Sequence, residues 1–261
     1  MNLVFYKYQG TGNDFIIIDN RENTVNLNKV QVKNLCNRRT GIGADGLMLM
    51  NNKPAFDFEM VYYNADGNMS TMCGNGGRCL VKFAYNMGLR KSEYLFNAVD
   101  GPHNAAIEDN GWVDLKMKDV DSVEVSVFSD YILDTGSPHY IKTVSDIQNI
   151  NVVKEGRDIR YNKRFADAGI NVNFVEQLED SNIYVRTYER GVEDETLSCG
   201  TGVTAAALVM AHNENGFNHV HVKTPGGNLA VEFEKAGETS FRNIWLCGPA
   251  IFVFKGEIEI L

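Results

Sequence analysis

The sequence predicts an α+β fold of two pseudo-symmetric domains from an internal duplication, each a mostly antiparallel β-sheet or barrel around a central helix. The first observation is a weak repeat with an offset of about 125 residues. The strand and turn FDFEMVYYNADG, followed by NMSTMCGNGGRCLVKFAYNMG, corresponds to SNIYVRTYERG, followed by VEDETLSCGTGVTAAALVMAHN. Each half therefore runs strand, turn, Cys-Gly-x-Gly and helix, and we expect the functional site in the cleft between the domains.

Three further matches, in the same order and at nearly the same offset, support the duplication. YKYQGTGNDFIII aligns with SDYILDTGSPHYI, which places Asn13 opposite Ser137. GIGADGLML aligns with AGINVNFVE, which places Gly46 near Asn171, and AVDGPHNAAIE aligns with TPGGNLAVEFE. Most other segments, such as DNGWVDLKM and FVFKGEIEI, have the alternation and turn punctuation of short strands.

Composition places the chain among globular proteins. Its 261 residues are 44% hydrophobic and 23% charged, which suits two ordinary domains. The net charge of -9 argues against nucleic acid as the main partner, because phosphate binding needs clustered Lys and Arg. No apolar run approaches the ~20 residues that cross a bilayer, and the N-terminus reads as a first strand rather than a signal peptide. We therefore expect a cytoplasmic protein with no membrane partner.

The five cysteines form neither a disulfide pattern nor a metal-binding pattern. They are Cys36, Cys73, Cys79, Cys199 and Cys247, an odd set without a CxxC pair. A chain without export signals is not expected to carry a disulfide framework, and Cys73 and Cys79 are spaced more widely than usual zinc ligands. We expect no metal. Cys36, Cys79 and Cys247 have no counterpart in the other half, so they are interpreted as packing residues.

Cys73 and Cys199 occupy matching positions, each at or just before a predicted helix N-terminus. Backbone N–H groups at such a position have no intrahelical acceptor, and the helix dipole favours negative charge. A free thiol, with a pKa of about 8.5, is only a few per cent ionised at neutral pH. A helix N-terminus lowers thiol pKa values by about one unit or more. One such cysteine alone would suggest packing, whereas two at matching positions indicate function.

A duplicated pair of thiols suits the inversion of an sp3 carbon. Inversion removes a proton from one face of the carbon and delivers a proton to the other, so it needs one acid–base group on each face. One thiol must start ionised and the other protonated, and the two exchange states at each turnover. The glycine-rich helix starts would hold a carboxylate and stabilise developing negative charge.

These motifs resemble those of the diaminopimelate epimerase family over essentially the whole chain. They are GTGNDF, NRRTGIGADG, NADGNMSTMCGNGGRC, GSPH, INVNFV, YERGVEDETLSCGTG and TPGG. The resemblance implies reversible interconversion of LL- and meso-2,6-diaminopimelate in lysine and peptidoglycan-precursor biosynthesis, without pyridoxal phosphate, metal or other cofactor. It also implies a homodimer and a last strand that returns to the first domain. The expected domains are residues 1–118 plus 251–261, and residues 119–250.

The resemblance also assigns site residues. Cys73 and Cys199 match the catalytic acid–base pair, and His139 and Glu189 match polar groups that support catalysis near the thiols. Arg190 suits the distal carboxylate, because its guanidinium can bind a carboxylate bidentately. The positions that match substrate-binding residues are Asn13, Asn64, Gly74, Asn75, Asn171, Glu189, Arg190, Gly200 and Thr201.

Two positions depart from the family pattern. Gly46 stands where many members carry Gln, so a side-chain contact with substrate is not carried over there. Ser137 stands where many members carry Asn, and its hydroxyl can still form hydrogen bonds but reaches less far. Both departures concern recognition of the distal end of the substrate.

Taken alone, the polar residues have other interpretations. Asn13 and Asn64 would each serve a tight turn, and Glu189 with Arg190 could form an exposed turn. A lone histidine such as His139 is usually a surface or hydrogen-bonded structural residue. Their repeated placement beside the cysteine motifs favours a functional interpretation.

Two other functions remain open on the sequence. A proline or hydroxyproline racemase would share the two-cysteine arrangement, but Asn64, Asn171 and Arg190 favour a substrate with a second polar end, which proline lacks. A non-catalytic thiol redox or ligand-binding module, a different class, would use two reactive cysteines. That alternative does not account for a glycine-rich helix start in both halves.

Overall fold

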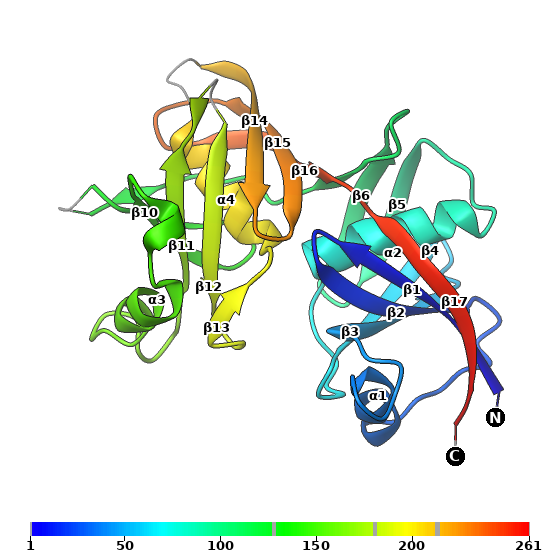
Figure 1. The fold of residues 1–261 in the computed structure, drawn as a ribbon. Coiled ribbons are helices and arrows are strands. Elements are labelled where there is room, and N and C mark those ends of the chain that lie inside the picture. The colour runs from blue at the N-terminus through cyan, green and yellow to red at the C-terminus, as the bar shows by residue number, and fades with distance from the viewer. Residues whose placement is uncertain (1, 127–128, 180–181, 212–214, 261) are drawn as a thin grey trace. The chain divides into compact units, whose positions relative to one another are not determined.

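Each half of the chain contains one long helix, α2 (Gly74–Asn86) in the first half and α4 (Gly200–Met210) in the second. The computed structural model describes residues 2–126, 129–179, 182–211 and 215–260. These residues form two compact units (Figure 1): unit 1 consists of Met1–Leu115 and Gly248–Leu261, and unit 2 of Lys116–Cys247. The domain bounds expected from the sequence, at 118/119 and 250/251, stay a prediction.

Unit 1 is a sheet of eight strands with one helix lying in its curve. Besides α2 it contains one shorter helix, α1 (Lys29–Cys36), which begins with a capping box. Pairing follows the order β17–β1–β2–β3–β4–β5–β6–β7, in which β2–β3 and β4–β5 are parallel and the other pairs antiparallel. The strands are β1 (Asn2–Gly10), β2 (Asn13–Asn20), β3 (Gly46–Asn51), β4 (Phe58–Asn64), β5 (Glu93–Ala98), β6 (Gly101–Ile107), β7 (Val113–Lys116) and β17 (Ile251–Glu259).

Unit 2 repeats this arrangement around α4, with α3 (Val152–Arg160) as its shorter α-helix and a 3-10 turn, η1 (Ile147–Asn149). Pairing follows the order β8–β9–β10–β11–β12–β14–β15–β16, and β13 pairs with β12. The strands are β8 (Glu124–Val125), β9 (Tyr131–Asp134), β10 (Pro138–Thr143), β11 (Asn171–Gln177), β12 (Ile183–Glu189), β13 (Asp194–Thr196), β14 (Gly216–Thr224), β15 (Gly227–Lys235) and β16 (Phe241–Gly248).

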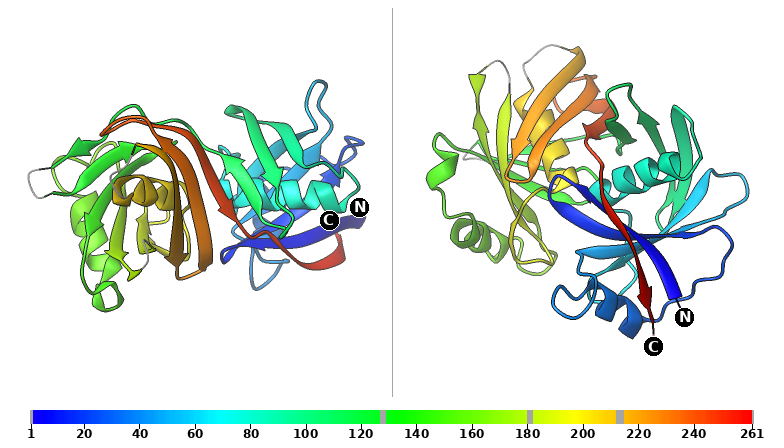
Figure 2. Two further views of the ribbon diagram at one scale, coloured as in Figure 1. Left: turned by 90° about the horizontal axis from the view of Figure 1, so that it is seen from above. Right: turned by 45° about the vertical axis from the view of Figure 1, so that its right-hand side comes forward.

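The alternation of parallel and antiparallel pairs is the same in both units. The parallel pairs β2–β3 and β4–β5 of unit 1 correspond to β10–β11 and β12–β14 of unit 2. In each unit the long helix lies within the curve of its own sheet (Figure 2). The predicted duplication and the mostly antiparallel sheets are therefore confirmed. Within the described residues neither sheet closes on itself, so each is an open sheet rather than a barrel.

Burial explains the contrasting composition of the two long helices. Along α4, residues such as Val203 and Leu208 are no more than 1% exposed, because strands cover the helix on several sides. The central helix of unit 1 is buried over most of its length too, yet it includes the fully buried Arg78. A buried charge requires polar partners, so hydrogen-bond acceptors are expected next to Arg78.

The hairpin between β1 and β2 places Asn13 at the end of unit 1 where α2 begins. Its two loop residues, Thr11 and Gly12, have φ angles of 48° and 84°, as a type I′ turn requires. Gly10 and Asn13 face each other across this turn. A glycine suits the left-handed conformation, so the GTGN sequence specifies the turn and with it the position of the Asn13 side chain.

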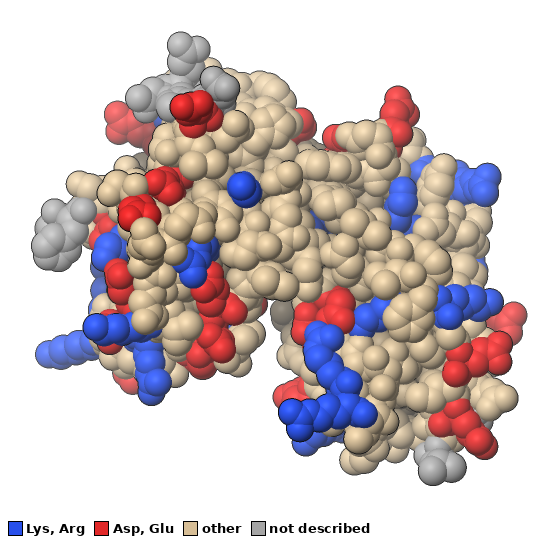
Figure 3. Space-filling model, viewed as in Figure 1, with Lys and Arg blue, Asp and Glu red and all other residues tan. Residues whose placement is uncertain are grey.

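The two ends of the chain lie side by side in unit 1, where Asn2 of β1 pairs with Glu259 of β17 (Figure 1). On the face drawn in Figure 3, Lys and Arg side chains are interspersed with Asp and Glu on each unit. Within the described ranges, no helix combines the length and the apolar character that crossing a membrane requires.

Candidate active site

Cys73 and Cys199 are the N-cap residues of α2 and α4. Both have extended backbone, with φ/ψ of -101°/127° at Cys73 and -109°/111° at Cys199. Each carbonyl accepts the first helical hydrogen bond, from Gly77 N at 2.7 Å and from Val203 N at 2.8 Å. Each thiol therefore lies at the positive end of a helix of at least eleven residues, where negative charge is stabilised.

The side chain of Asn13 connects the β1–β2 turn to the start of α2. Its Oδ1 atom lies 3.6 Å from Sγ of Cys73 and accepts from Nδ2 of Asn75 at 3.4 Å. Its Nδ2 donates to Oδ2 of Asp45 at 2.7 Å. Asn13, Cys73 and Asn75 are thus brought together in unit 1, and Gly74 lies between the last two at the first helical position.

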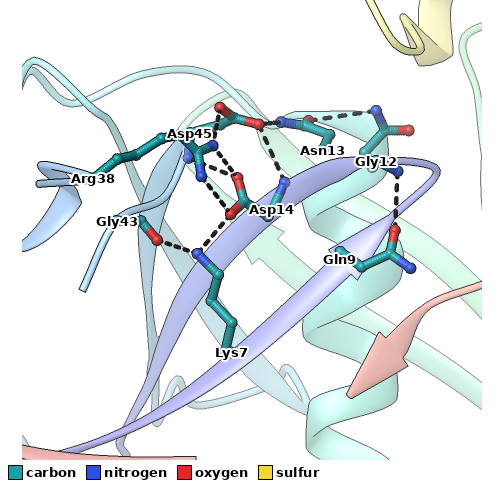
Figure 4. Close-up of polar contacts among 9 residues, drawn as sticks. Lys7, Gln9, Gly12, Asn13, Asp14, Arg38, Gly43 and Asp45 are labelled. Carbon is teal, nitrogen blue, oxygen red and sulfur yellow. Dashed lines mark hydrogen bonds and ion pairs between the residues drawn. The ribbon is translucent and has the colours of Figure 1, made fainter. Parts of the chain in front are cut away.

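A charged cluster anchors Asn13 from behind (Figure 4). Arg38 donates to Oδ1 of Asp14 at 2.5 Å and to Oδ1 of Asp45 at 2.8 Å. The buried Lys7 ammonium lies 2.6 Å from Oδ2 of Asp14. Although burial opposes ionisation, hydrogen bonds from Arg38 and Lys7 hold the pKa of Asp14 well below its usual range. The Asp14 carboxylate is therefore ionised near pH 7 and acts as a fixed acceptor.

The buried Arg78 holds Asn75 in place. Its Nη2 donates to Oδ1 of Asn75 at 2.9 Å, and its Nη1 lies 3.4 Å from the carbonyl oxygen of Gly74. Because the guanidinium only donates, Oδ1 of Asn75 must be the atom that faces it. Gly10 allows this packing, since a Cβ atom there would lie 3.3 Å from the Asn75 carbonyl and 3.5 Å from Nη2 of Arg78.

In unit 2, Cys199 lies at the end of a row of hydroxyl and imidazole groups. Oγ1 of Thr201 lies 3.5 Å from Sγ of Cys199, and Oγ of Ser137 lies 3.4 Å from Oγ1 of Thr201. Nε2 of His139 lies 3.1 Å from Oγ of Ser137. His139 is fully buried, and desolvation together with the charge of Arg190 lowers its pKa to about 3, so the imidazole is neutral near pH 7.

Asn171 connects this row to the β12 turn. Its Nδ2 donates to Oγ of Ser137 at 3.0 Å and to the Pro138 carbonyl at 3.1 Å, and its Oδ1 accepts from the backbone N–H of Arg190 at 2.9 Å. The Arg190 side chain is exposed and donates to the carbonyl of Ala168 at 3.1 Å. Ser137, Asn171 and the backbone of Arg190 are thus close together in unit 2.

Asn173, on the same face of β11 as Asn171, was not singled out in the sequence. Its Nδ2 donates to Nδ1 of His139 at 3.1 Å and to the Tyr140 carbonyl at 3.3 Å, while its Oδ1 accepts from Thr187 at 2.8 Å. Two asparagines spaced by two residues in an otherwise apolar strand, INVNFV, were the available signal, because alternate residues share a face.

Glu189 and Asn64 end corresponding strands, β12 and β4. Oε2 of Glu189 accepts from Thr196 at 2.9 Å on the adjacent β13. Asn64 is exposed, and its backbone N–H donates to the Asn68 carbonyl at 2.9 Å in a turn. The structure therefore gives Asn64 the turn position that its sequence context allows, and its role in binding stays a prediction.

Gly46 lies against Tyr62 and Tyr63 of β4. A Cβ atom at position 46 would lie 2.5 Å from Cε2 of Tyr62 and 2.7 Å from the Tyr63 carbonyl oxygen. The space next to Gly46 is therefore filled from the neighbouring strand. Sequence alone does not reveal this contact, because it depends on the β3–β4 register, in which Gly46 pairs with Asn64.

The other three cysteines are buried. Cys36, Cys79 and Cys247 are 3%, 0% and 2% exposed. Burial raises the pKa of Cys36 to about 11 and that of Cys79 to about 12, so both remain protonated near pH 7. These properties agree with the packing interpretation. No cluster of three or more His, Cys, Asp or Glu residues within the described ranges is arranged to hold a metal ion.

Comparison with known proteins identifies the family to which this sequence is related. The sequence profile of the family Diaminopimelate epimerase matches residues 5–123 and 131–253. The diaminopimelate epimerase of Flavobacterium psychrophilum is 50% identical over 256 residues, which are 97% of this chain and 99% of that protein.

Solved structures with low sequence identity share the fold. A PhzF-family phenazine biosynthesis protein from Bacillus anthracis has a TM-score of 0.77 at 15% identity, with both chains covered completely. A hydroxyproline epimerase from Agrobacterium vitis has a TM-score of 0.70 at 13% identity, covering 98% of this chain and 92% of that one.

The sequence relationships define an isomerase of the epimerase class. The chain belongs to the diaminopimelate epimerase family.

Proposed function

We propose that this protein interconverts LL- and meso-2,6-diaminopimelate by two-base catalysis with the thiols of Cys73 and Cys199. The observation that carries the proposal is their position as N-caps of α2 and α4, the corresponding helices of a duplicated fold. Membership of the diaminopimelate epimerase family supports the choice of substrate. The reaction would serve lysine and peptidoglycan-precursor biosynthesis.

The chemistry follows from the two helix starts. A thiolate on one cysteine removes the α-proton, and the thiol of the other cysteine delivers a proton to the opposite face of the same carbon. Backbone N–H groups at Gly74, Asn75 and Gly200 would hold the α-carboxylate and stabilise the negative charge that develops. This stabilisation by the backbone takes the place of pyridoxal phosphate in the proposal.

The remaining site residues would bind the rest of the substrate. Arg190 offers a guanidinium for the distal carboxylate, and its anchoring contact to Ala168 leaves further donors on the fork. Asn64 and Asn171 would contact the amino and carboxyl groups of the distal end. Glu189 and His139 would lie near the reacting amino group and the thiols, and Asn13 and Thr201 adjoin the cysteines.

The decisive experiment follows deuterium entry from D2O into LL-diaminopimelate, with L-proline as a parallel substrate. We expect deuterium at a single α-carbon together with the appearance of the meso isomer, and no exchange on proline. Exchange on proline alone would favour the racemase alternative. Absence of exchange on both substrates would exclude the epimerase function.

We further propose a cytoplasmic homodimer. Four consecutive hydrophobic residues of β17, at positions 251–254, are between 43% and 51% exposed, which is unusual for a run of this kind and fits contact with a second copy. The two acid–base thiols of the proposed reaction require a reducing compartment, which the cytoplasm provides. Light scattering of the protein and of Val253→Glu tests the dimer, since the added charge should produce monomers.

A further inference from the structure

We propose that the two thiols are not equivalent at rest: Asn13 holds Cys73 as the thiol, whereas a chain of hydrogen bonds through Asn173, His139, Ser137 and Thr201 holds Cys199 as the thiolate. This inference rests on the proposed function, because it assigns the starting state of the two-base reaction. The four residues of the chain and Asn13 act as positioning residues.

The chain of hydrogen bonds in unit 2 begins at Asn173, which sets the direction in which each later group donates. Its Nδ2 must be the atom that faces His139, because the same nitrogen donates to the Tyr140 carbonyl and Oδ1 accepts from Thr187. Nδ1 of His139 is therefore an acceptor, and its single proton lies on Nε2. The neutral state that burial imposes on His139 agrees with this tautomer.

The next step is the hydroxyl of Ser137. Its oxygen accepts from Nε2–H of His139 at 3.1 Å and from Nδ2–H of Asn171 at 3.0 Å. The orientation of the Asn171 amide is fixed as well, since its Oδ1 accepts from the Arg190 backbone. With two donors on its lone pairs, Ser137 has its own O–H left to donate to Oγ1 of Thr201 at 3.4 Å.

The last step reaches the sulfur. Because Oγ1 of Thr201 accepts from Ser137, its own proton is available for Sγ of Cys199 at 3.5 Å. A hydroxyl that donates to sulfur stabilises the thiolate over the thiol. The hydrogen bond adds to the effect of the α4 N-terminus, and successive hydrogen bonds in a chain reinforce each other.

The arrangement beside Cys73 has the opposite polarity. Arg78 fixes the amide of Asn75, whose Nδ2 then donates to Oδ1 of Asn13, and Asp45 accepts from Nδ2 of Asn13. The atom of Asn13 that faces Sγ of Cys73 is therefore a carbonyl oxygen, at 3.6 Å. An oxygen acceptor stabilises the S–H form and opposes a thiolate.

Other charged and titratable groups adjoin both networks. In unit 1 they are Lys7, Asp14, Arg38, Asp45, Arg78 and Cys79, and in unit 2 they are Arg190 and Glu189. Arg78 acts on Cys73 through Asn75, and Arg38 acts through Asp45. We therefore attribute the difference in protonation between the Cys73 and Cys199 sulfurs to their local amide and hydroxyl contacts, which act in addition to these charges.

The test measures alkylation of each cysteine by iodoacetamide from pH 5.5 to 10, with mass spectrometry of the separate peptides. Only thiolates react, so the midpoint of the rate reports ionisation, whereas accessibility changes only the plateau. We expect the midpoint of Cys199 to lie at least about one pH unit below that of Cys73, a tenfold difference in ionisation. Equal midpoints, or the reverse order, would overturn the inference.

Variants identify the groups responsible. Thr201→Val should raise the Cys199 midpoint and leave the Cys73 midpoint unchanged. Thr201→Ser, which keeps a hydroxyl, should retain the low Cys199 midpoint. Asn13→Ala should lower the Cys73 midpoint alone. Thr204→Val is the matched control, because the Thr204 hydroxyl donates to the Gly200 carbonyl in the same helix and lies outside the chain. A Thr201→Val protein with an unchanged Cys199 midpoint would contradict the assignment.

The alkylation readout does not require turnover, so it separates this inference from the proposed function. Separated midpoints in a protein that exchanges no substrate deuterium would support the protonation assignment and exclude the epimerase function. Normal deuterium exchange together with coincident midpoints would support the epimerase function and overturn the protonation assignment.

Discussion

A Cβ atom at Gly202 would lie only 2.3 Å from Oδ1 of Asn173, so the start of α4 packs directly on that buried amide. We predict that Gly202→Ala displaces Asn173 and lowers the free energy of unfolding by about 1–3 kcal/mol, as overpacking does. Urea denaturation measures this. Gly77→Ala is the matched control, because its Cβ would meet its nearest neighbours at 3.4 Å. Equal stability of the two variants would contradict this account.

The buried His139 should make the protein acid-sensitive. Its pKa of about 3 in the folded state lies below the ordinary value of 6.5, so below pH 6.5 the unfolded chain binds a proton that the folded protein does not. The free energy of unfolding should therefore fall by up to about 1.4 kcal/mol per pH unit between pH 6.5 and 3. Urea denaturation at several pH values measures the free energy of unfolding as a function of pH. This free energy should fall less steeply with falling pH in His139→Gln than in the original protein. An equal dependence on pH in the two proteins would be inconsistent with a neutral buried imidazole.

Asp14 should stabilise unit 1 through its bonds to Lys7 and Arg38. We predict that Asp14→Asn lowers the free energy of unfolding by about 1–3 kcal/mol at pH 7, since it leaves the buried Lys7 ammonium poorly compensated. Because the pKa of Asp14 is depressed, its contribution is present above about pH 4 and is lost as pH falls below that value. Glu124→Gln, which removes an exposed pair with Arg164, is the control and should change little.

Under the proposed two-base reaction, Cys73 and Cys199 should each be indispensable. We predict that Cys73→Ala and Cys199→Ala each reduce turnover of LL-diaminopimelate by about 10²–10⁴-fold, because one face of the carbon then lacks its proton carrier. Cys247→Ala, which removes a buried packing thiol, should retain turnover in the folded protein. A single active-site variant with normal turnover would refute two-base catalysis.

The rate should depend on pH in a bell-shaped manner, because one thiol must be ionised while the other is protonated. Measurement of kcat/KM for LL-diaminopimelate from pH 6 to 10 checks this. The apparent pKa values belong to the coupled pair of thiols rather than to either residue. A flat profile across this range would contradict paired thiol catalysis.

The features that the sequence predicts well are those with a local physical cause. Glycines after Cys73 and Cys199 mark a helix start, and the alternation of apolar residues marks the strands, so the duplication could be recognised from the pattern alone. The GTGN turn is partly local, since Gly12 favours the positive φ angle that it adopts, whereas the positive φ angle of Thr11 is not expected of a β-branched residue.

The parts that could not be predicted depend on register and on distant partners. Arg38 and Asp14 meet across 24 positions of sequence, and Arg38 carries no mark that distinguishes it from Arg39. Asn173 lies in an apolar strand, and its role emerges only when β10 and β11 pair in parallel, with His139 opposite Asn171. Sequence patterns specify faces of strands, whereas these contacts depend on which strands become neighbours.

The pairing of β17 with β1 has a consequence for synthesis of the protein. Translation finishes the contiguous segment 116–247 before it finishes β17, so the second unit can fold while the first still lacks a strand. A chain that stalls or is cut before Ile251 would leave one edge of β1 open to other chains, which is a recognised route to aggregation.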